Sequence, residues 1–539
     1  DDIIHYLGPS LEKHKGCTII DIHPGTCLFS SKLHDFLQPK CHLLMEPEEK
    51  YVQPFIRPLL DRPNSTYRHT RFAMGHRAFY WAAFSELQED PTLIPARPAL
   101  SPDDPKSRQL DTSLLLVGNL ARMYKSRSVD NDHLDPNAQT LHQFSTTALN
   151  NSFFHNNGLV RSLWWMPEHY KPVITGLTYL QRTGMCAGME FGLSMTEVVG
   201  VKPLAALVKE RRAIGVHLPG PGLTALVNSD VKQAMKDDGV TVPPGRALQP
   251  IGTPASESID PDVWRESPLE PTLSTAAELE KQIDAVHART EDLLKSTIRD
   301  SVRLYETIVH PLSCLLAESA FDEYYIKCAA SLVDLTIQLL NTEANFKHLE
   351  EHSLDAATAT HLHQRILALD AAVHHLLETR WTKVMPTVLH LSNDVLAFYA
   401  TPRLMAWNRR RMDPLQATSA DFWPANRGLA LIDLVPQPRD LAVPGLANRH
   451  EVVLVAAAMF RHLMGMGARP LPHALNTFAV NAGHDLIPMV PAITDVRRGG
   501  RLNPARVRCR MVTDEALEGL VKAFFEWPFR PQTVDGASA

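Results

Sequence analysis

Two acidic residues near the start of the chain stand where a nucleoside ligand could be bound. Asp21 lies in the short apolar run 18–22, which a turn containing Gly25 closes, and Glu46 follows a second apolar run at 42–45. Ligands of open α/β sheets bind at the carboxyl ends of strands, where an acidic residue about twenty positions after the first turn accepts hydrogen bonds from ribose hydroxyls. The spacing therefore predicts a nucleoside cofactor at Asp21, Gly25 and Glu46. A solvated carboxylate at a strand end is the alternative.

These residues need a sheet to bring them together, and the sequence predicts one. Short apolar runs bounded by turn residues alternate with segments of helical spacing, which indicates a parallel sheet with crossover helices. Asn119 closes one of the runs and joins the candidate site. The expected strands are 18–22, 42–45, 114–117, 160–166, 196–201 and 429–435, and helices are expected at 28–37 and 452–464.

The strand pattern stops and later resumes, which predicts an inserted unit. We expect an α/β domain over 1–216, a flexible Pro-, Gly- and Ser-rich linker over 217–272, and a helical insertion over 273–400 that opens with a capping box at 275–278. The chain would then return to the α/β domain over 401–440 and end in a helical domain and tail over 441–539.

Bulk composition excludes some classes of protein. The 539 residues are 44% hydrophobic, enough for a sizeable core, and the net charge of -6 gives no overall attraction for polyanions. Seven cysteines show no zinc-ligand spacing, and no apolar run is long enough to predict a membrane span. His348-x-x-Glu351-His352 matches a zinc-hydrolase pattern, but no third ligand follows it, so we expect a polar helix face and no metal site.

Several motifs together resemble a known family. Asp21-x-x-Pro-Gly25, Leu-Leu-Met-Glu46, Gly-Asn119-Leu, and the closing Phe525-Glu-Trp-Pro-Phe-Arg-Pro531 are similar to motifs of rRNA adenine dimethyltransferases. The similarity is greater to the fungal mitochondrial transcription factor B proteins, and it covers about residues 1–210 and 403–535. The resemblance implies a Rossmann-like class I methyltransferase sheet, with a large helical insertion and a small helical C-terminal domain. It also implies a location in the mitochondrial matrix.

The catalytic motif departs from that family. An active member has Asn-Leu-Pro-Tyr or a close variant, in which the aromatic ring stacks on an extruded adenine. This chain has Asn119-Leu120-Ala121-Arg122, and its glycine loop keeps only Gly25. Losing a stacked ring costs about 1–3 kcal/mol of base binding. We therefore expect no confident catalytic residue, and only a vestigial cofactor site at Asp21, Gly25, Glu46 and Asn119.

Two arginine clusters indicate a polyanion partner. Their members are Arg497, Arg498, Arg501, Arg506, Arg508 and Arg510 in the first cluster, and Arg409, Arg410 and Arg411 in the second. The first lies in a stretch without acids, which favours phosphate contacts. Solvated arginine faces are the alternative for both.

The resemblance then implies a function. The chain would be a mitochondrial transcription initiation factor that binds RNA polymerase and promoter DNA and assists melting, with no required cofactor. One alternative is an active rRNA adenine N6,N6-dimethyltransferase that uses S-adenosylmethionine. A second alternative is an RNA-binding protein associated with the mitochondrial ribosome.

Overall fold

A computed structural model describes most of the chain outside residues 249–334. The described ranges are 1–71, 90–97, 104–123, 136–210, 221–248, 356–379, 402–422, 428–439 and 449–531, with single positions at 100, 441 and 443 and others within 335–347 and 393–400. These ranges contain the central sheet and the C-terminal helices.

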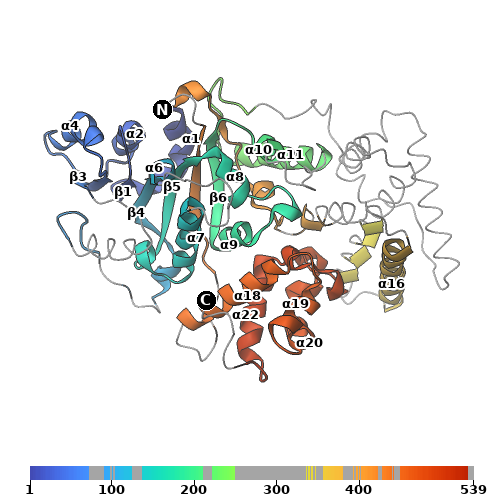
Figure 1. Ribbon diagram of the computed structural model, residues 1–539. Coiled ribbons are helices and arrows are strands. Elements are labelled where there is room, and N and C mark those ends of the chain that lie inside the picture. Colours follow the sequence, from blue (N-terminus) through green and yellow to red (C-terminus); the bar gives the residue numbers. More distant parts are fainter. Residues whose placement is uncertain are drawn as a thin grey trace, which may run out of the picture.

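An eight-stranded sheet forms the centre of the α/β domain (Figure 1). Its strand order is β3-β2-β1-β4-β5-β8-β6-β7. The strands are β1 (Thr18–Ile22), β2 (Cys41–Met45), β3 (Tyr67–Thr70), β4 (Leu110–Asn119), β5 (Leu159–Pro167), β6 (Leu193–Gly200), β7 (Leu415–Gln416) and β8 (Leu429–Pro436).

Most neighbouring strands run parallel, and β8 is the exception. The pairs β1–β2, β1–β4, β2–β3, β4–β5 and β6–β7 are parallel. Strand β8 is antiparallel to both of its neighbours, β5 and β6. Because β8 returns to the sheet after the helical insertion, the insertion interrupts one α/β domain rather than separating two. The expected α/β sheet is confirmed at this level.

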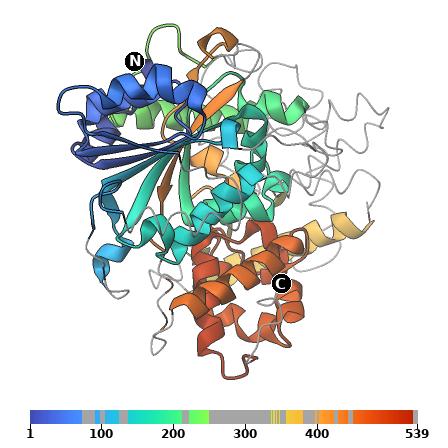
Figure 2. The ribbon, with the colours of Figure 1, turned by 60° about the vertical axis from the view of Figure 1, so that its left-hand side comes forward.

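Helices cover both faces of the sheet (Figure 2). Strand residues alternate between the two faces, so Ile19 packs with helices on one side and Ile20 with helices on the other. The Ile19 face is covered by α1 (Asp2–Leu11), α2 (Leu28–Leu37) and α11 (Pro221–Asp237). The Ile20 face is covered by α7 (Pro136–Leu149), α8 (Lys171–Ile174) and α9 (Gly184–Gly192). Strands buried on both sides read as apolar runs, which explains why the sequence predicted them.

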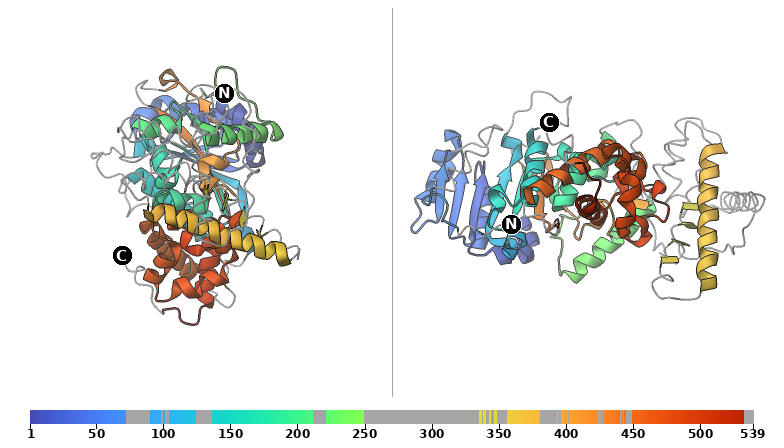
Figure 3. Two further views of the ribbon diagram at one scale, coloured as in Figure 1. Left: turned by 90° about the vertical axis from the view of Figure 1, so that its right-hand side faces the viewer. Right: turned by 90° about the horizontal axis from the view of Figure 1, so that it is seen from below.

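A separate group of helices forms the C-terminal domain (Figure 3). It contains α18 (Arg449–Gly465), α19 (Leu471–Phe478), α20 (Ala482–Asp485), α21 (Pro491–Thr494) and α22 (Asp514–Glu526) around a core of its own. Helix α16 (Ala356–Thr379), from the insertion, lies beside these helices. Shorter α-helices in the described ranges are α3 (Glu49–Tyr51), α4 (Arg57–Leu60), α6 (Leu120–Met123) and α10 (Leu204–Glu210), and a π-helical turn spans Val52–Ile56.

The structure differs from the sequence prediction in three elements. Strands β3 and β7 were not predicted, because Tyr67–Thr70 is mostly polar and Leu415–Gln416 has only two residues. The predicted linker is wrong over 221–237, which forms α11. Val227, Val231 and Met235 recur every four residues in α11 and are buried against the sheet.

Other predicted elements lie outside the described residues. These are the capping box at 275–278 and the zinc-like pattern at 348–352. Within the described part, no helix is both long and apolar enough to cross a membrane.

Candidate functional site at the carboxyl edge of the sheet

The strand register brings the predicted cofactor residues to one edge. Strand β1 lies between β2 and β4, with Ile22 opposite Met45 on one side and Gly118 on the other. Gly25, Glu46 and Asn119 therefore follow three adjacent strands at the point where the strand order reverses, the place where open α/β sheets bind ligands. The register therefore places these residues at one edge of the sheet, and cofactor binding there stays a prediction.

The carboxylate of Glu46 accepts hydrogen bonds from the protein's own main chain. Its side chain is fully buried. The backbone N–H of Gly25 donates to Oε2 at 3.0 Å, and the backbone N–H of Glu48 donates to Oε1 at 3.1 Å. Each carboxylate oxygen thus already accepts a hydrogen bond from the main chain, and the group ties the β1 turn to the end of β2.

The β1 turn keeps an unusual backbone without several glycines. His23, Gly25 and Cys27 have φ angles of 56°, 63° and 57°. The left-handed region costs a non-glycine residue about 1–2 kcal/mol, so His23 and Cys27 are strained. Both side chains are buried, and Cys27 packs against Leu44. Two non-glycine residues of the turn thus hold a backbone conformation that glycine adopts without strain.

Asp21 faces a buried polar chain under this turn. Its Oδ2 lies 3.5 Å from Nε2 of His42. Nδ1 of His42 lies 3.1 Å from Nδ1 of His34, and Nε2 of His34 lies 3.3 Å from Oγ1 of Thr66. One consistent proton arrangement has Thr66 donating to His34 and His34 donating to His42. Nε2 of His42 faces Oδ2 of Asp21 without forming a hydrogen bond to it. Asp21 therefore lies against His42 of β2, and His42 in turn contacts His34 of α2.

Two features of this group of buried polar side chains were not predicted from the sequence. The ring of Tyr67 stacks on those of His34 and His42, with centroids 3.8 Å and 5.1 Å apart. Burial, with the neighbouring His42, lowers the pKa of His34 to about 4. Isolated histidines on separate elements give no signal in the sequence that they will meet.

Asn119 caps a short helix. Its Oδ1 accepts the backbone N–H of Ala121 at 3.1 Å, at the start of α6. Leu120 is fully buried, while the side chain of Arg122 lies outside the described residues. The degenerate motif thus serves the strand-to-helix turn.

Aromatic rings lie near Asn119. Trp165 is opposite Asn119 in the sheet register. Its ring makes edge-to-face contacts with Phe29, at 5.6 Å between centroids, and with Phe422, at 6.0 Å. All three residues are half-buried. Because these rings come from three distant parts of the chain, nothing in the sequence indicated that they would pack together.

The first arginine cluster is assembled but largely paired. Arg497 binds Asp495, and Arg498 binds Glu515. Arg501 and Arg506 bind acids of the helical insertion. Arg510 donates to the backbone oxygen of Leu180 at 3.1 Å.

One member of this cluster differs from the others. Arg508 is half-buried, and burial lowers its pKa. No ion pair involves Arg508 among the residues that the structure describes. A phosphate would therefore have to displace existing partners from most of this cluster, and its role in nucleic-acid binding stays a prediction.

The second arginine cluster is divided. Arg410 is buried, binds Asp413 at 2.9 Å and stacks on Trp407 at 4.2 Å. Arg411 is exposed and binds Asp238 at 2.7 Å. Arg409 makes a longer contact of 3.9 Å with Asp514. The three guanidinium groups do not form one continuous surface.

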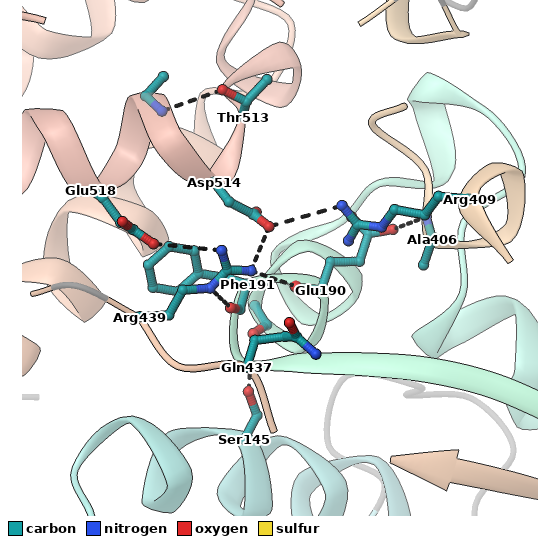
Figure 4. Close-up of polar contacts among 12 residues, drawn as sticks. Ser145, Glu190, Phe191, Ala406, Arg409, Gln437, Arg439, Thr513, Asp514 and Glu518 are labelled. Atoms are coloured by element: carbon teal, nitrogen blue, oxygen red, sulfur yellow. Dashed lines mark hydrogen bonds and ion pairs between the residues drawn. The ribbon is translucent and has the colours of Figure 1, made fainter. Parts of the chain in front are cut away.

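A polar junction joins the sheet to the C-terminal helices (Figure 4). Arg439, just after β8, pairs with Asp514 at 2.5 Å and with Glu518 at 3.5 Å. It also donates to the backbone oxygens of Glu190 and Phe191. Burial raises the pKa of Glu518, although Arg439 opposes this shift.

A pocket of about 190 Å³ lies at this junction, lined by Pro402, Leu404, Arg409, Arg439, Thr513, Asp514, Glu515 and Glu518. The charges that line it largely neutralise one another. The arrangement holds two domains together and offers no group poised for catalysis.

The described residues contain no cluster of His, Cys, Asp and Glu that could hold a metal ion. No model of a known protein family matches the chain, and no curated protein matches it in sequence.

Proposed function

We propose that this chain is a mitochondrial transcription initiation factor built on a degenerate methyltransferase fold. In this proposal it binds RNA polymerase and promoter DNA and assists melting, and it transfers no methyl group. The motif resemblance supports the identity of the fold, and the mixed sheet with its switch point between β1 and β4 is compatible with it.

The burial and hydrogen bonding of Glu46 support the proposal that the protein transfers no methyl group. In a working site this carboxylate would receive the ribose hydroxyls of S-adenosylmethionine. Here the Gly25 and Glu48 amides already donate to it, and its side chain has no exposed surface. The carboxylate oxygens keep further lone pairs, but a ribose hydroxyl could reach them only after the residues that bury Glu46 moved aside.

The conformation of the turn adds a second cost. His23 and Cys27 hold their side chains inside the turn at left-handed φ angles. A cofactor would have to displace these side chains, and the strained backbone would have to rearrange with them. Asn119, the remaining motif residue, already caps α6. Together these contacts favour a binding protein.

Promoter-dependent run-off transcription tests the initiation role. The assay would use mitochondrial RNA polymerase from the same source on a duplex promoter and on the same promoter with a pre-melted bubble. We expect the protein to stimulate the duplex template strongly and the bubble template little, because melting is then already done. Equal output with and without the protein on the duplex template would contradict the proposal.

Calorimetry with S-adenosylmethionine tests the enzyme alternative. We expect no saturable binding heat. Saturable binding, together with methyl incorporation into small-subunit rRNA that Asn119→Ala abolishes, would establish the dimethyltransferase instead. Co-sedimentation with ribosomal particles rather than with polymerase would favour the ribosome-associated alternative.

A further inference from the structure

The helical insertion contacts the arginine-rich stretch of the C-terminal domain. We call residues 497–510 the arginine segment. Nε of Arg501 donates to Oε2 of Glu343 at 2.7 Å, and both side chains are buried. Nε of Arg506 donates to Oδ1 of Asp370, in α16, also at 2.7 Å. These partners are 158 and 136 positions apart in the chain.

The Asp370 contact involves more than one bond. Nη2 of Arg506 also donates to the backbone oxygen of Asp370 at 3.1 Å, and Nδ2 of Asn503 donates to Oδ2 at 3.0 Å. The side chains of Arg506 and Asp370 are 17% and 20% exposed, so this pair lies at the rim of the contact. These bonds join α16 to the C-terminal domain.

Arg508 lies close enough to Arg506 for their charges to repel. This repulsion, after burial, contributes to the lowered pKa of Arg508. The carboxylate of Asp370 therefore neutralises Arg506, one of two neighbouring guanidinium groups. Without that carboxylate, the rim would present two uncompensated positive charges.

We infer that Glu343 and Asp370 compete with the phosphates of single-stranded nucleic acid for the arginine segment. Carboxylate and phosphate are both matched by the planar donors of a guanidinium group. Arg506 directs Nε and Nη2 at Asp370, so a phosphate can accept from these donors only when Asp370 leaves. We call Glu343 and Asp370 together the acidic cover. In this inference the acidic cover occupies arginine donors that would otherwise bind nucleic acid. This inference rests on the proposed function.

The exposed rim pair gives the sharpest test. Asp370→Asn removes the competing charge but keeps a side-chain oxygen that can accept from Asn503. We would measure binding of a fluorescein-labelled oligothymidylate by fluorescence anisotropy over a series of NaCl concentrations. We expect about fivefold tighter binding than wild type, and a salt dependence steeper by about 0.7 for each additional phosphate that the protein neutralises.

Two further variants keep the test specific. Asp230→Asn removes the same charge from α11, where Asp230 binds Arg403 far along the chain, and should leave oligothymidylate affinity unchanged. Asp370→Asn combined with Arg506→Gln should return the affinity to near the wild-type value, because the freed guanidinium is gone. Circular dichroism would verify that each variant keeps its helices.

The outcomes separate this inference from the proposed function. If wild type binds the oligonucleotide and Asp370→Asn binds it equally well, the acidic cover is refuted while the proposed function stands. The same holds if Asp230→Asn tightens binding as much as Asp370→Asn does. If neither wild type nor Asp370→Asn binds at low salt, the acidic cover and the nucleic-acid part of the proposed function both fail.

Discussion

Glu46 illustrates how main-chain N–H groups can hold a buried carboxylate. Two backbone N–H groups hold its carboxylate, one from the β1 turn and one from the residues after β2. The carboxylate thereby links the carboxyl ends of β1 and β2 through hydrogen bonds. We therefore expect Glu46 to stabilise the fold, so substitutions should lower the free energy of unfolding.

Replacing Glu46 by glutamine should destabilise the fold. The side-chain NH2 group would face a backbone N–H, leaving a buried donor unsatisfied, and the charge-assisted bonds would be lost. We expect a loss of about 1–3 kcal/mol in the free energy of unfolding, measured by urea denaturation. Glu49→Gln is the control, because Glu49 forms an exposed pair with Arg71 and should cost under about 1 kcal/mol. An unchanged stability for Glu46→Gln would mean that the carboxylate is free to serve a ligand.

Buried histidines should make the protein sensitive to acid. Burial lowers the pKa of His14 and of His34 to about 4 and that of His155 to about 3, from an ordinary value of 6.5. The unfolded chain then binds more protons than the folded protein below 6.5, so stability falls as the pH drops from 6.5 toward 4. Above about pH 7.5 these groups are neutral in both states and contribute no pH dependence.

The measurement is the urea midpoint as a function of pH. His14→Gln should reduce the acid dependence, because glutamine can still donate to the backbone oxygen of Thr112 without titrating. His473→Gln changes an exposed side chain and should leave the dependence as it is. A midpoint that stays constant between about pH 7 and about pH 4.5 would contradict the prediction.

At the scale of single elements, β4 depends on close packing beside the candidate site. Gly118 precedes Asn119, and the ring of Trp164 from β5 lies directly over it. A Cβ at Gly118 would come within 2.2 Å of that ring, closer than real atoms approach. Trp164 is fully buried, and its Nε1 donates to Oγ of Ser162 at 2.9 Å, so the ring has little freedom to move.

Gly118→Ala should therefore be strongly destabilising. Overpacking of a rigid core costs about 1–3 kcal/mol or more, and we expect a loss at or above the upper end of that range in urea denaturation. Gly465→Ala, at the end of α18, meets no atom within 4 Å and should change stability by less than about 1 kcal/mol. Similar effects for the two variants would show that Trp164 can move aside.

Helix α11 was not predicted from the sequence because of the residues on either side of it. Its apolar residues repeat every four positions, but the surrounding residues are rich in Pro and Gly, and these favoured a linker. The helix forms because one face has a sheet to pack against. Tertiary burial, more than local propensity, stabilises most such helices.

At the scale of the whole molecule, charged side chains join the sheet to the C-terminal domain. Arg439 contacts Asp514 and Glu518 in α22, and Arg182 binds Glu190 and two backbone oxygens near residue 511. These groups are mostly buried. Removing one partner of such a network leaves the others charged and unpaired.

Arg439→Gln should therefore loosen the C-terminal domain. We expect a loss of about 3–5 kcal/mol in the free energy of unfolding. Faster hydrogen exchange should appear in α18 and α22 before it appears in the sheet. Arg411→Gln, which breaks an exposed pair with Asp238, is the matched control and should leave exchange in those helices unchanged. Uniformly faster exchange across both domains would indicate that the junction does not separate them.

Local residue patterns were enough to predict the layered core and the position of the candidate site. Strands buried on both faces must be apolar, so six of the eight strands were visible, and the strand-end rule correctly grouped Gly25, Glu46 and Asn119. Local patterns carry this information because burial and turn formation act over a few residues. Strands β3 and β7 were too polar or too short to give such a pattern.

The partners of the charged and polar groups could not be predicted from local patterns and depend on the folded arrangement. It pairs Arg501 and Arg506 with acids more than 130 positions away. It also places Asp21 beside His42 of β2, which contacts His34 of α2. A run of arginines has the same sequence whether it faces solvent, a phosphate or a carboxylate. Its partner is set by which surfaces the fold brings into contact, because hydrogen bonds and ion pairs act over only a few ångströms.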